Sequence, residues 1–398
     1  MNLYSKENKK SILKRKVPFF LVVVFLVMVS VILIFIVKNI SSKISSDVPV
    51  ITNIPRIHKT QKSLVPERKF KPGPISMKLL KTKGCVADGM LSGYAGNTGS
   101  MVKLINRSEC VYLHRSLETW AAPPDFEKAA KIMDSVEKTN MVYGMFIAEA
   151  LRKNARYFYA DENRDFKFSE MCQKGTDNRW GEHTCVPDFG KKEYRKYLDY
   201  ITRQAMDTGI QSFIFGQIYL PDSASFYGDS EAPGIIAKMR QYAKDKGLQI
   251  VVGAQTNSIT DEKYLKLFDY IEGGVGIDSA GNVENGPCWS GKSSCWALLW
   301  NENYSSKANN VFLNLDWSGL KSDDMSKFAR MSQKTRISTL KNLYQTFTSR
   351  NMGFMMPFLA TINKNNGGCH GPMKRYYSPD NKYTCRDENQ INEILRGK

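Results

Sequence analysis

Strand-like and helix-like segments alternate along most of this chain, and this alternation constrains the fold more than any other feature. Residues 192–208 carry an apolar stripe at helical spacing, formed by Tyr194, Tyr197, Leu198, Ile201 and Ala205. Apolar strand-like runs lie at 110–120, 141–151, 211–220, 248–257, 269–278, 310–319 and 352–360. Helix-like runs between them lie at 125–140, 192–209, 235–247, 261–268 and 324–349. Seven strands alternating with helices over about 250 residues predict a (β/α)8 barrel.

The eighth strand of such a barrel is not obvious from the sequence. Residues 156–161, RYFYAD, are the candidate for it, and the glycine-rich segment 76–110 is expected to form loops, as a lid or a sheet extension. An open, doubly wound α/β sheet is the main alternative. That fold ordinarily carries a ligand-binding fingerprint at a strand–helix turn, and neither a G-x-G-x-x-G nor a Walker sequence occurs here.

An uncharged run of 21 residues, 17–37, is long enough to cross a bilayer as a helix. Residues 1–16 before it contain six Lys/Arg and one Glu, whereas only Lys38 and Lys43 follow closely. This bias predicts a cytoplasmic N-terminus and an extracytoplasmic C-terminal part. A cleaved signal peptide is the alternative, but its apolar region is usually about 7–15 residues long and ends at a small-residue cleavage site. Both readings export the rest of the chain.

The net charge of +18 is concentrated near the N-terminus. Residues 1–16 carry +5 and residues 38–83 carry +9, which leaves +4 for residues 84–398. A nucleic-acid-binding domain would show a basic face on the fold itself, so nucleic acid is not an expected partner. The sequence thus predicts a basic tail at 1–16, an anchor at 17–37, a Pro/Ser/Lys-rich linker at 38–75 and a barrel domain at 76–398.

All eight cysteines follow the predicted anchor, which suits disulfide formation outside the cytoplasm. Pairing of sequence neighbours predicts bridges 85–110, 172–185, 288–295 and 369–385. Buried free thiols or a metal site are the alternatives. A zinc site is disfavoured because no C-x-x-C pair occurs and the chain has four histidines. We expect no metal and no cofactor.

Polar side chains follow the predicted strands at their carboxyl ends, where barrel enzymes form their active sites. The carboxylates selected as catalytic candidates are Glu149, Glu272 and Asp316. The candidates for substrate binding are His114, Glu118, Trp120, Gln217, Tyr219, Gln255, Asn257 and Trp317. Each has a structural alternative. His114 fits a buried core histidine, and Glu118 and Glu149 fit surface positions equally well.

This mixture of acids, amides and aromatics suits carbohydrate better than phosphate. Acids and amides can hydrogen-bond sugar hydroxyls, and an indole ring can stack on the apolar face of a pyranose. A phosphate site would instead use glycine turns and basic residues. The six tryptophans, 120, 180, 289, 296, 300 and 317, all fall in or beside loops predicted at the carboxyl ends of the strands. The expected partner is therefore a carbohydrate or polysaccharide.

The segment CVPDFGKKEYRKYLDYITRQAMDTGIQSFIFGQIYLPD, residues 185–222, resembles the central part of glycoside hydrolase (β/α)8 barrels. In those barrels a similar helix leads through a glycine into a strand that ends in a catalytic or substrate-binding acid. The resemblance implies a glycan-active barrel without identifying one family. The amylase-like version ends this strand with Asp, whereas this chain has Gln217, and a neutral amide is neither a nucleophile nor a useful proton donor.

The acids of a hydrolase must then come from other strands. We predict that Glu272 and Asp316, at successive strand ends, form the carboxylate pair, with Glu149 as a substitute for either. A catalytically inactive barrel that binds glycans or organises an envelope assembly is the alternative function. A third hypothesis is a structural ectodomain whose disulfide-pinned loops bind a protein partner, which exposed tryptophans outside any cleft would favour.

Overall fold

The computed structural model describes residues 72–93, 97–120, 122–222, 229–284, 299–315, 323–362, 368–370, 376 and 385–397. All of them belong to one compact unit, Val65–Lys398. The predicted anchor at 17–37, the tail before it, Asp316, Trp317 and the predicted 288–295 bridge lie outside these residues. Among the residues described, no helix is both long and apolar enough to cross a bilayer.

The sheet has eight parallel strands in the order β1-β2-β3-β8-β9-β10-β11-β12. Their bounds are β1 Gly84–Val86, β2 Tyr112–Glu118, β3 Val142–Ile147, β8 Ser212–Phe215, β9 Val251–Ala254, β10 Tyr270–Val275, β11 Val311–Leu315 and β12 Gly353–Phe354. The first and last strands also meet, because Met356 N donates to Gly84 O at 3.0 Å and Val86 N donates to Met356 O at 2.8 Å. The predicted (β/α)8 barrel is confirmed.

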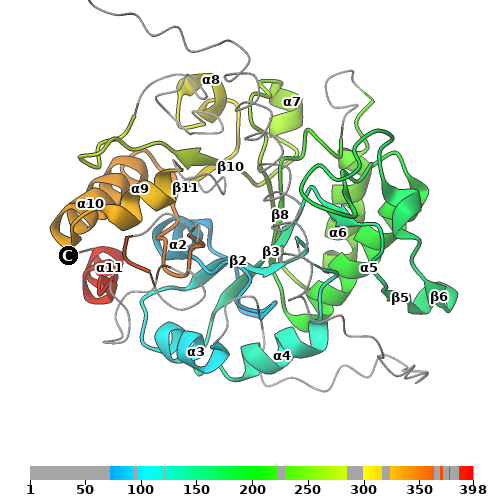
Figure 1. Cartoon of the computed structure of the whole chain (residues 1–398), viewed down its shortest axis with the longest axis horizontal. Helices are drawn as coiled ribbons and strands as arrows, with labels where there is room; N and C mark the ends of the chain where they lie inside the picture. Colours follow the sequence, from blue (N-terminus) through cyan, green and yellow to red (C-terminus); the bar gives the residue numbers. More distant parts are fainter. Residues whose placement is uncertain are drawn as a thin grey trace, which may run out of the picture. The chain divides into compact units, whose positions relative to one another are not determined.

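Helices lie around the strands and cover the outer face of the barrel (Figure 1). They are α2 Met77–Thr82, α3 Thr98–Asn106, α4 Phe126–Asp134, α5 Lys192–Thr208, α6 Ala232–Asp245, α7 Glu262–Leu265, α8 Glu302–Ser305, α9 Asp324–Arg330, α10 Gln333–Thr348 and α11 Glu388–Arg396. The apolar stripe predicted on α5 is buried, and Gly209 ends this helix with a left-handed φ of 96°.

Two predictions about secondary structure were wrong. The eighth strand is β1, from the segment expected to be loops, because an apolar triplet too short to show a period is buried between β2 and residue 356. Residues 156–161 instead contribute β5 Phe158–Tyr159, which pairs with β6 Arg164–Asp165 in a separate hairpin. The single helix predicted near 324–349 is two helices, since Ser332 adopts an extended conformation and caps α10 through the N–H of Thr335.

The excursion between β3 and α5, residues 148–191, projects from the carboxyl end of the barrel. It contains the short helical turns η1 Ala160–Glu162 and η2 Phe168–Met171, and its ends are joined where β4 Leu151–Arg152 pairs with β7 Thr184–Cys185. An aromatic cluster attaches the excursion to α5. The ring centroids of Phe166 and Phe168 in the excursion each lie 5.3 Å from the ring centroid of Tyr197 in α5. The excursion is thus a built structure rather than an open loop.

Large rings and small residues alternate across the barrel interior. Tyr270 stacks on Phe312 with ring centroids 4.2 Å apart, and Tyr112 lies 6.3 Å from the same phenyl ring. A Cβ added to Gly253 would come within 2.2 Å of the Tyr270 ring, and one added to Gly144 would come within 3.3 Å of Tyr112. The glycines therefore provide the space that the tyrosines occupy.

Two predicted disulfides are present and one is not. Cys85 is bonded to Cys110 and Cys172 to Cys185. Cys369 and Cys385 are buried free thiols, and their side chains are hydrogen-bonded to each other. The predicted 369–385 disulfide is therefore wrong. The sequence spacing identified two neighbouring thiols but could not determine whether they are oxidised.

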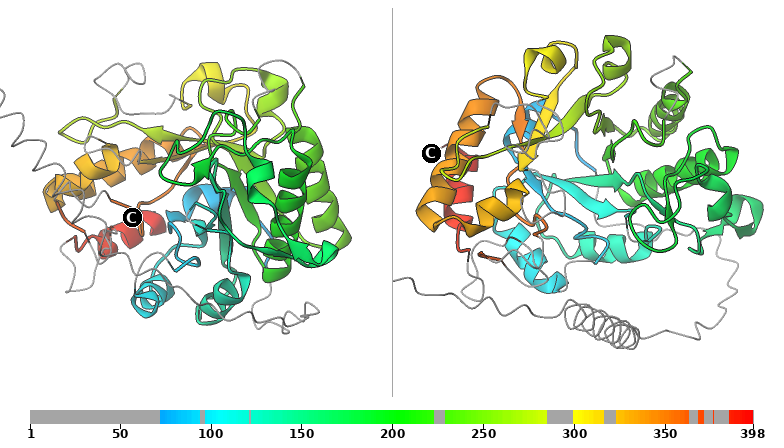
Figure 2. Two further views of the ribbon diagram at one scale, coloured as in Figure 1. Left: turned by 45° about the vertical axis from the view of Figure 1, so that its right-hand side comes forward. Right: turned by 45° about the horizontal axis from the view of Figure 1, so that its top comes forward.

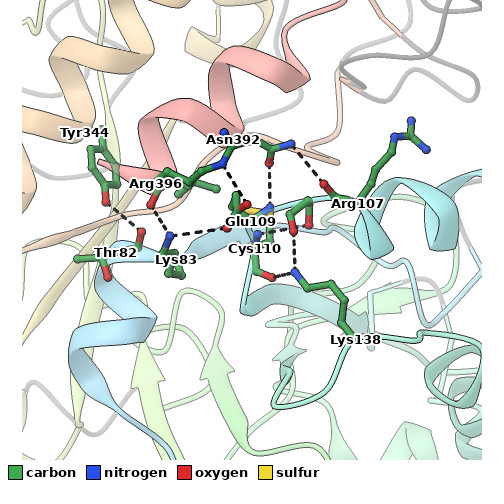
Figure 3. A network of polar contacts seen from close by, with 12 residues as sticks. Thr82, Lys83, Arg107, Glu109, Cys110, Lys138, Tyr344, Asn392 and Arg396 are labelled. Atoms are coloured by element: carbon green, nitrogen blue, oxygen red, sulfur yellow. Dashed lines mark hydrogen bonds and ion pairs between the residues drawn. A yellow bond between two sulfur atoms is a disulfide. The ribbon is translucent and has the colours of Figure 1, made fainter. Parts of the chain in front are cut away.

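The C-terminal helix α11 is fastened by polar contacts to the segment that precedes β2 (Figure 3). Glu109 N donates to Asn392 Oδ1 at 2.8 Å, and Arg396 Nε lies 3.1 Å from Glu109 Oε1. Lys83 donates to the carbonyl of Leu395. Figure 2 shows α9, α10 and α11 together on one side of the barrel. These contacts lie at the amino ends of the strands, the end that serves stability in such barrels.

Adding one methyl group at Gly253 tests the interior packing. Because Tyr270 is held by Phe312, we expect Gly253→Ala to lower the free energy of unfolding by about 1–3 kcal/mol. Gly234→Ala on α6 is the matched control, since an added Cβ there meets nothing within 4 Å and alanine favours a helix. Urea denaturation measures both variants, and equal stabilities would contradict this account of the interior.

Candidate active site

The centre of the site is a buried contact between two barrel strands. His114 on β2 and Glu272 on β10 point into the interior, and His114 Nε2 lies 2.5 Å from Glu272 Oε2. The other imidazole nitrogen, Nδ1, lies 2.8 Å from the hydroxyl of Tyr112, which in turn lies 2.9 Å from Ser212 Oγ. His114 is thus a buried interior histidine, as the structural alternative predicted, and it contacts a candidate catalytic carboxylate.

The environment of Glu272 favours its ionised form. Burial by itself raises the pKa of this carboxyl, but the neighbouring His114 and the guanidinium of Arg115 lower it, and the resulting pKa is below the ordinary value. Gln255 Nε2 donates to Glu272 Oε1 at 3.0 Å, so both carboxylate oxygens have partners. The structure therefore holds a negative charge in the barrel interior.

Two glutamines connect Glu272 with Glu149. Gln255 donates to Glu272 and accepts a hydrogen bond from Gln217 N at 3.3 Å. The side-chain amide of Gln217 donates to Glu149 Oε1. The chain Glu149–Gln217–Gln255–Glu272 thus joins three residues that follow β3, β8 and β9 with Glu272, which lies within β10. Gln217, a neutral amide, thus contacts an acid from a neighbouring strand.

The pKa of Glu149 is shifted in the opposite direction from that of Glu272. Only 2% of Glu149 is exposed, and burial raises the pKa of its carboxyl to about 7, even though Arg115 and Gln217 act in the opposite direction. Its Oε2 has no hydrogen-bond partner among the described residues. A Cβ at Gly216 would come within 2.4 Å of that oxygen, so glycine at 216 leaves the room that the carboxyl needs.

The backbone around the site is unusual at the positions that carry these side chains. Arg115, Gln217 and Asn257 have φ values of 56°, 33° and 48°. Arg115 lies where the register of β2 against β3 shifts between Leu113 and Leu117. Such bulges and left-handed residues redirect side chains, and they concentrate at functional sites in many proteins. The site is therefore built partly by conformations that a regular strand does not adopt.

The bulge places Arg115 between two carboxylates. Its Nη2 lies 3.1 Å from Glu118 Oε1, its Nε lies 3.4 Å from Asp88 Oδ1, and its guanidinium lies 4.1 Å from the centre of the Phe146 ring. Glu118 therefore pairs with an internal cation. Asp88, which follows β1, was missed by sequence reasoning because that segment was interpreted as loops, although the apolar triplet before an acid was a usable signal.

The remaining binding candidates divide into two groups. Tyr219 donates to Gln217 Oε1 at 2.8 Å and is hydrogen-bonded to Asn257, so both residues belong to the network. Trp120 follows β2 and lies 5.8 Å from Trp180 of the excursion. Trp300 instead packs on Phe347 of α10 at 6.3 Å, so the tryptophans do not all serve the carboxyl ends of the strands. Sequence reasoning did not select Asn314. This residue lies on the same face of β11 as Phe312, the face that points into the barrel interior.

No family model matches this chain, and no curated protein matches it. Solved structures do. A GH27 β-L-arabinopyranosidase from Geobacillus stearothermophilus has 13% identity over 49% of this chain and 54% of its own, with a TM-score of 0.31. A cyclic α-maltosyl-(1→6)-maltose hydrolase from Arthrobacter globiformis has 12% identity over 84% of this chain and 79% of its own, with a TM-score of 0.44. A debranching enzyme from Nostoc punctiforme has 10% identity over 79% of this chain and 71% of its own, with a TM-score of 0.41.

The chain thus spans about half of the arabinopyranosidase. These glycoside hydrolases are structures to which the chain is similar, and no family is identified. The barrel itself is established by the strand order of this chain. The residues described contain no group of three His, Cys, Asp or Glu placed to hold a metal ion.

The raised pKa of Glu149 predicts a pH-dependent stability. Its pKa rises from 4.5 to about 7 on folding, so the unfolded chain loses this proton first as the pH increases. The stabilisation from the protonated carboxyl is complete below about pH 4.5 and is lost as the pH rises to about 7. The free energy of unfolding of Glu149→Gln, relative to that of the wild type, should therefore increase by about 2–3 kcal/mol between pH 5 and pH 8.

Denaturant unfolding at several pH values measures this difference. Glu137→Gln, at an exposed glutamate, is the control and should keep a constant difference from the wild type. A Glu149→Gln variant whose stability parallels the wild type across this range would show that the carboxyl is already ionised in the fold.

Proposed function

We propose that this chain is a glycoside hydrolase-like enzyme that acts on a polysaccharide or glycoconjugate through two carboxyl groups. One observation carries the proposal. Glu149 and Glu272 are both buried, their pKa values are shifted in opposite directions, and Gln217 and Gln255 link them. Glycosidases use an un-ionised acid together with an ionised carboxylate.

The two glutamates have different tasks in this proposal. Glu149, whose Oε2 is unpartnered among the described residues, donates a proton to the glycosidic oxygen as the bond to the anomeric carbon breaks. Glu272, kept ionised by His114, either attacks the anomeric carbon or removes a proton from an attacking water. His114 is then a positioning residue, because it acts on the sugar through Glu272.

The substrate is held by neutral groups around this pair. Gln217, Tyr219, Gln255 and Asn257 supply donors and acceptors for sugar hydroxyls, and Trp120 supplies a ring face. Glu118 acts through Arg115. Asp316 stays a candidate partner for Glu272 and Trp317 a candidate binding residue, as the sequence predicts.

A catalytically silent, glycan-binding barrel is the second candidate function. The observation that favours it is the saturation of Glu272, whose two oxygens contact His114 and Gln255 and of which 1% is exposed. A carboxylate in that state can hold the interior together without reaching a sugar. The two functions differ in whether substitution of Glu272 changes cleavage or only stability.

We also propose that residues 17–37 anchor the protein in a membrane, with residues 1–16 in the cytoplasm and the barrel outside. The uncharged run and the Lys/Arg residues before it support this arrangement. The disulfides Cys85–Cys110 and Cys172–Cys185 agree with it, because such bonds persist in oxidising compartments.

Separate Glu149→Gln and Glu272→Gln variants test the chemistry on a panel of glycans, with binding and cleavage measured independently. We expect each to lower kcat by about 10²- to 10⁴-fold while glycan binding is retained, because a neutral amide replaces a proton donor or an anion. Glu137→Gln should cleave normally. Full hydrolysis by both site variants would exclude this pair, and binding without cleavage by the wild type would establish the silent barrel.

The location is tested by fractionation of cells that express the full chain. We expect the protein to stay in the membrane after alkaline carbonate extraction, because a spanning helix resists it. A variant with Val24 and Phe25 both replaced by Arg should lose the anchor and be extracted. Protease added outside should digest the barrel domain of the wild type, and a protected barrel would refute the proposed orientation.

A further inference from the structure

This inference rests on the proposed function, because it concerns the sugar bound at the same end of the barrel. We propose that Trp120, Trp180 and Arg179 form a subsite for a carboxylate-bearing sugar, such as a uronic acid residue in a polysaccharide. Trp120 comes from the end of β2, and the other two come from the β3–α5 excursion. The proposal therefore assigns a binding role to the turn between Cys172 and Cys185, which contributes no residue to the Glu149–Glu272 network.

The turn that carries Arg179 and Trp180 is held rigidly by the chain around it. The disulfide Cys172–Cys185 encloses it. Within the turn, Asn178 N donates to Thr184 O at 2.7 Å and Asn178 Oδ1 accepts from His183 N at 2.9 Å. Trp180 N donates to Thr184 Oγ1 at 3.1 Å. A backbone fixed in this way presents its side chains at low entropic cost, as a binding site requires.

The excursion is also fixed against the loop that follows β8. Gln173 Nε2 donates to Leu220 O at 2.6 Å, and Phe189 N donates to Pro221 O at 2.9 Å. Leu220 adjoins Tyr219, whose hydroxyl donates to Gln217 in the central network. The excursion thus meets the carboxyl end of β8 as well as that of β2, and its turn lies near the proposed chemistry.

Trp120 and Trp180 form an aromatic pair that the core does not fully cover. Their ring centroids are 5.8 Å apart with planes inclined at 68°, and both side chains are partly exposed. An edge-to-face pair leaves ring faces available for contact, and aromatic faces complement the C–H face of a sugar. Two such rings from segments far apart in the sequence indicate a constructed aromatic surface.

Arg179 adds a positive charge to this surface. Its guanidinium lies 5.1 Å from the centre of the Trp180 ring, and the side chain is exposed. Within the described part of the chain, no carboxylate forms an ion pair with it, whereas neighbouring Lys153 is paired with Asp177 at 2.8 Å. Stacking on an indole orients a guanidinium while leaving its N–H donors free, which suits a planar anion.

The charge of Arg179 reaches the central network. Burial, together with the nearby Glu149, raises the pKa of Tyr219 to about 12, while Arg179 acts in the opposite direction. The guanidinium is therefore within electrostatic range of the hydroxyl that contacts Gln217. A sugar on the aromatic pair could place its carboxylate against Arg179 while the adjacent residue of the same polymer lies toward Glu149.

The test measures binding of oligosaccharides to the full chain in detergent by titration calorimetry. The probes are oligosaccharides of glucuronic, galacturonic and mannuronic acid, their carboxyl-reduced counterparts, and a sulfated neutral oligosaccharide. Reduction removes only the carboxylate, so each pair isolates its contribution. We expect at least one uronate to bind about ten-fold more tightly than its reduced form, with the preference weakened by salt.

Matched variants assign that preference to residues. Arg179→Gln should weaken uronate binding about ten-fold and leave the reduced sugars unchanged. Trp180→Ala should weaken both, because stacking on a ring does not depend on the charge. Lys174→Gln removes an exposed positive charge from the same excursion and should change neither.

Each other outcome overturns the inference in a different way. Equal binding of uronates and reduced sugars, with no effect of Arg179→Gln, removes the carboxylate subsite and leaves the proposed function intact. Tighter binding of the sulfated sugar than of every uronate replaces carboxylate by sulfate as the ligand. Absence of binding by every glycan removes the subsite and the proposed function together.

Discussion

A contact between an imidazole and a carboxylate inside the barrel governs much of the architecture around it. His114 is on β2 and Glu272 is on β10, two strands that are not adjacent in the sheet. Burial of either side chain alone in its charged form would carry a large desolvation cost. Their contact is extended by hydrogen bonds through Tyr112, Ser212 and Gln255. Removal of one partner from such a pair typically costs about 3–5 kcal/mol, since the other is left uncompensated.

The same contact creates the difference between the two glutamates. Glu272 and Glu149 are equally removed from water, so burial alone would keep both neutral. His114 reverses the outcome for Glu272 only, whereas Glu149 has an amide as its nearest partner. Two residues of one chemical type thus have pKa values shifted in opposite directions by their neighbours, which is how one fold can hold both an acid and an anion.

The sequence contained enough information for the barrel and for most of its polar residues. The helical stripe of α5 and the apolar runs of β2, β3 and β10 are long enough to show a period, whereas the triplet of β1 is not. Glu149, Gln217 and Gln255 were selected near the ends of predicted strands, and Glu272 was selected between Ile271 and two glycines; parallel strands bring such positions together. The pairing of Glu118 with Arg115 lies at a bulge in β2, which the pattern of residue types does not predict.

The pairing of β4 with β7 brings the two ends of residues 153–183 next to each other at the rim. A segment that departs and returns at one point can change in length or composition without altering the register of any barrel strand. The disulfide between Cys172, inside this segment, and Cys185 of β7 would help to keep such a variant folded as a separate element. Related chains could therefore diversify in what they recognise while the interior that holds Glu149 and Glu272 stays the same.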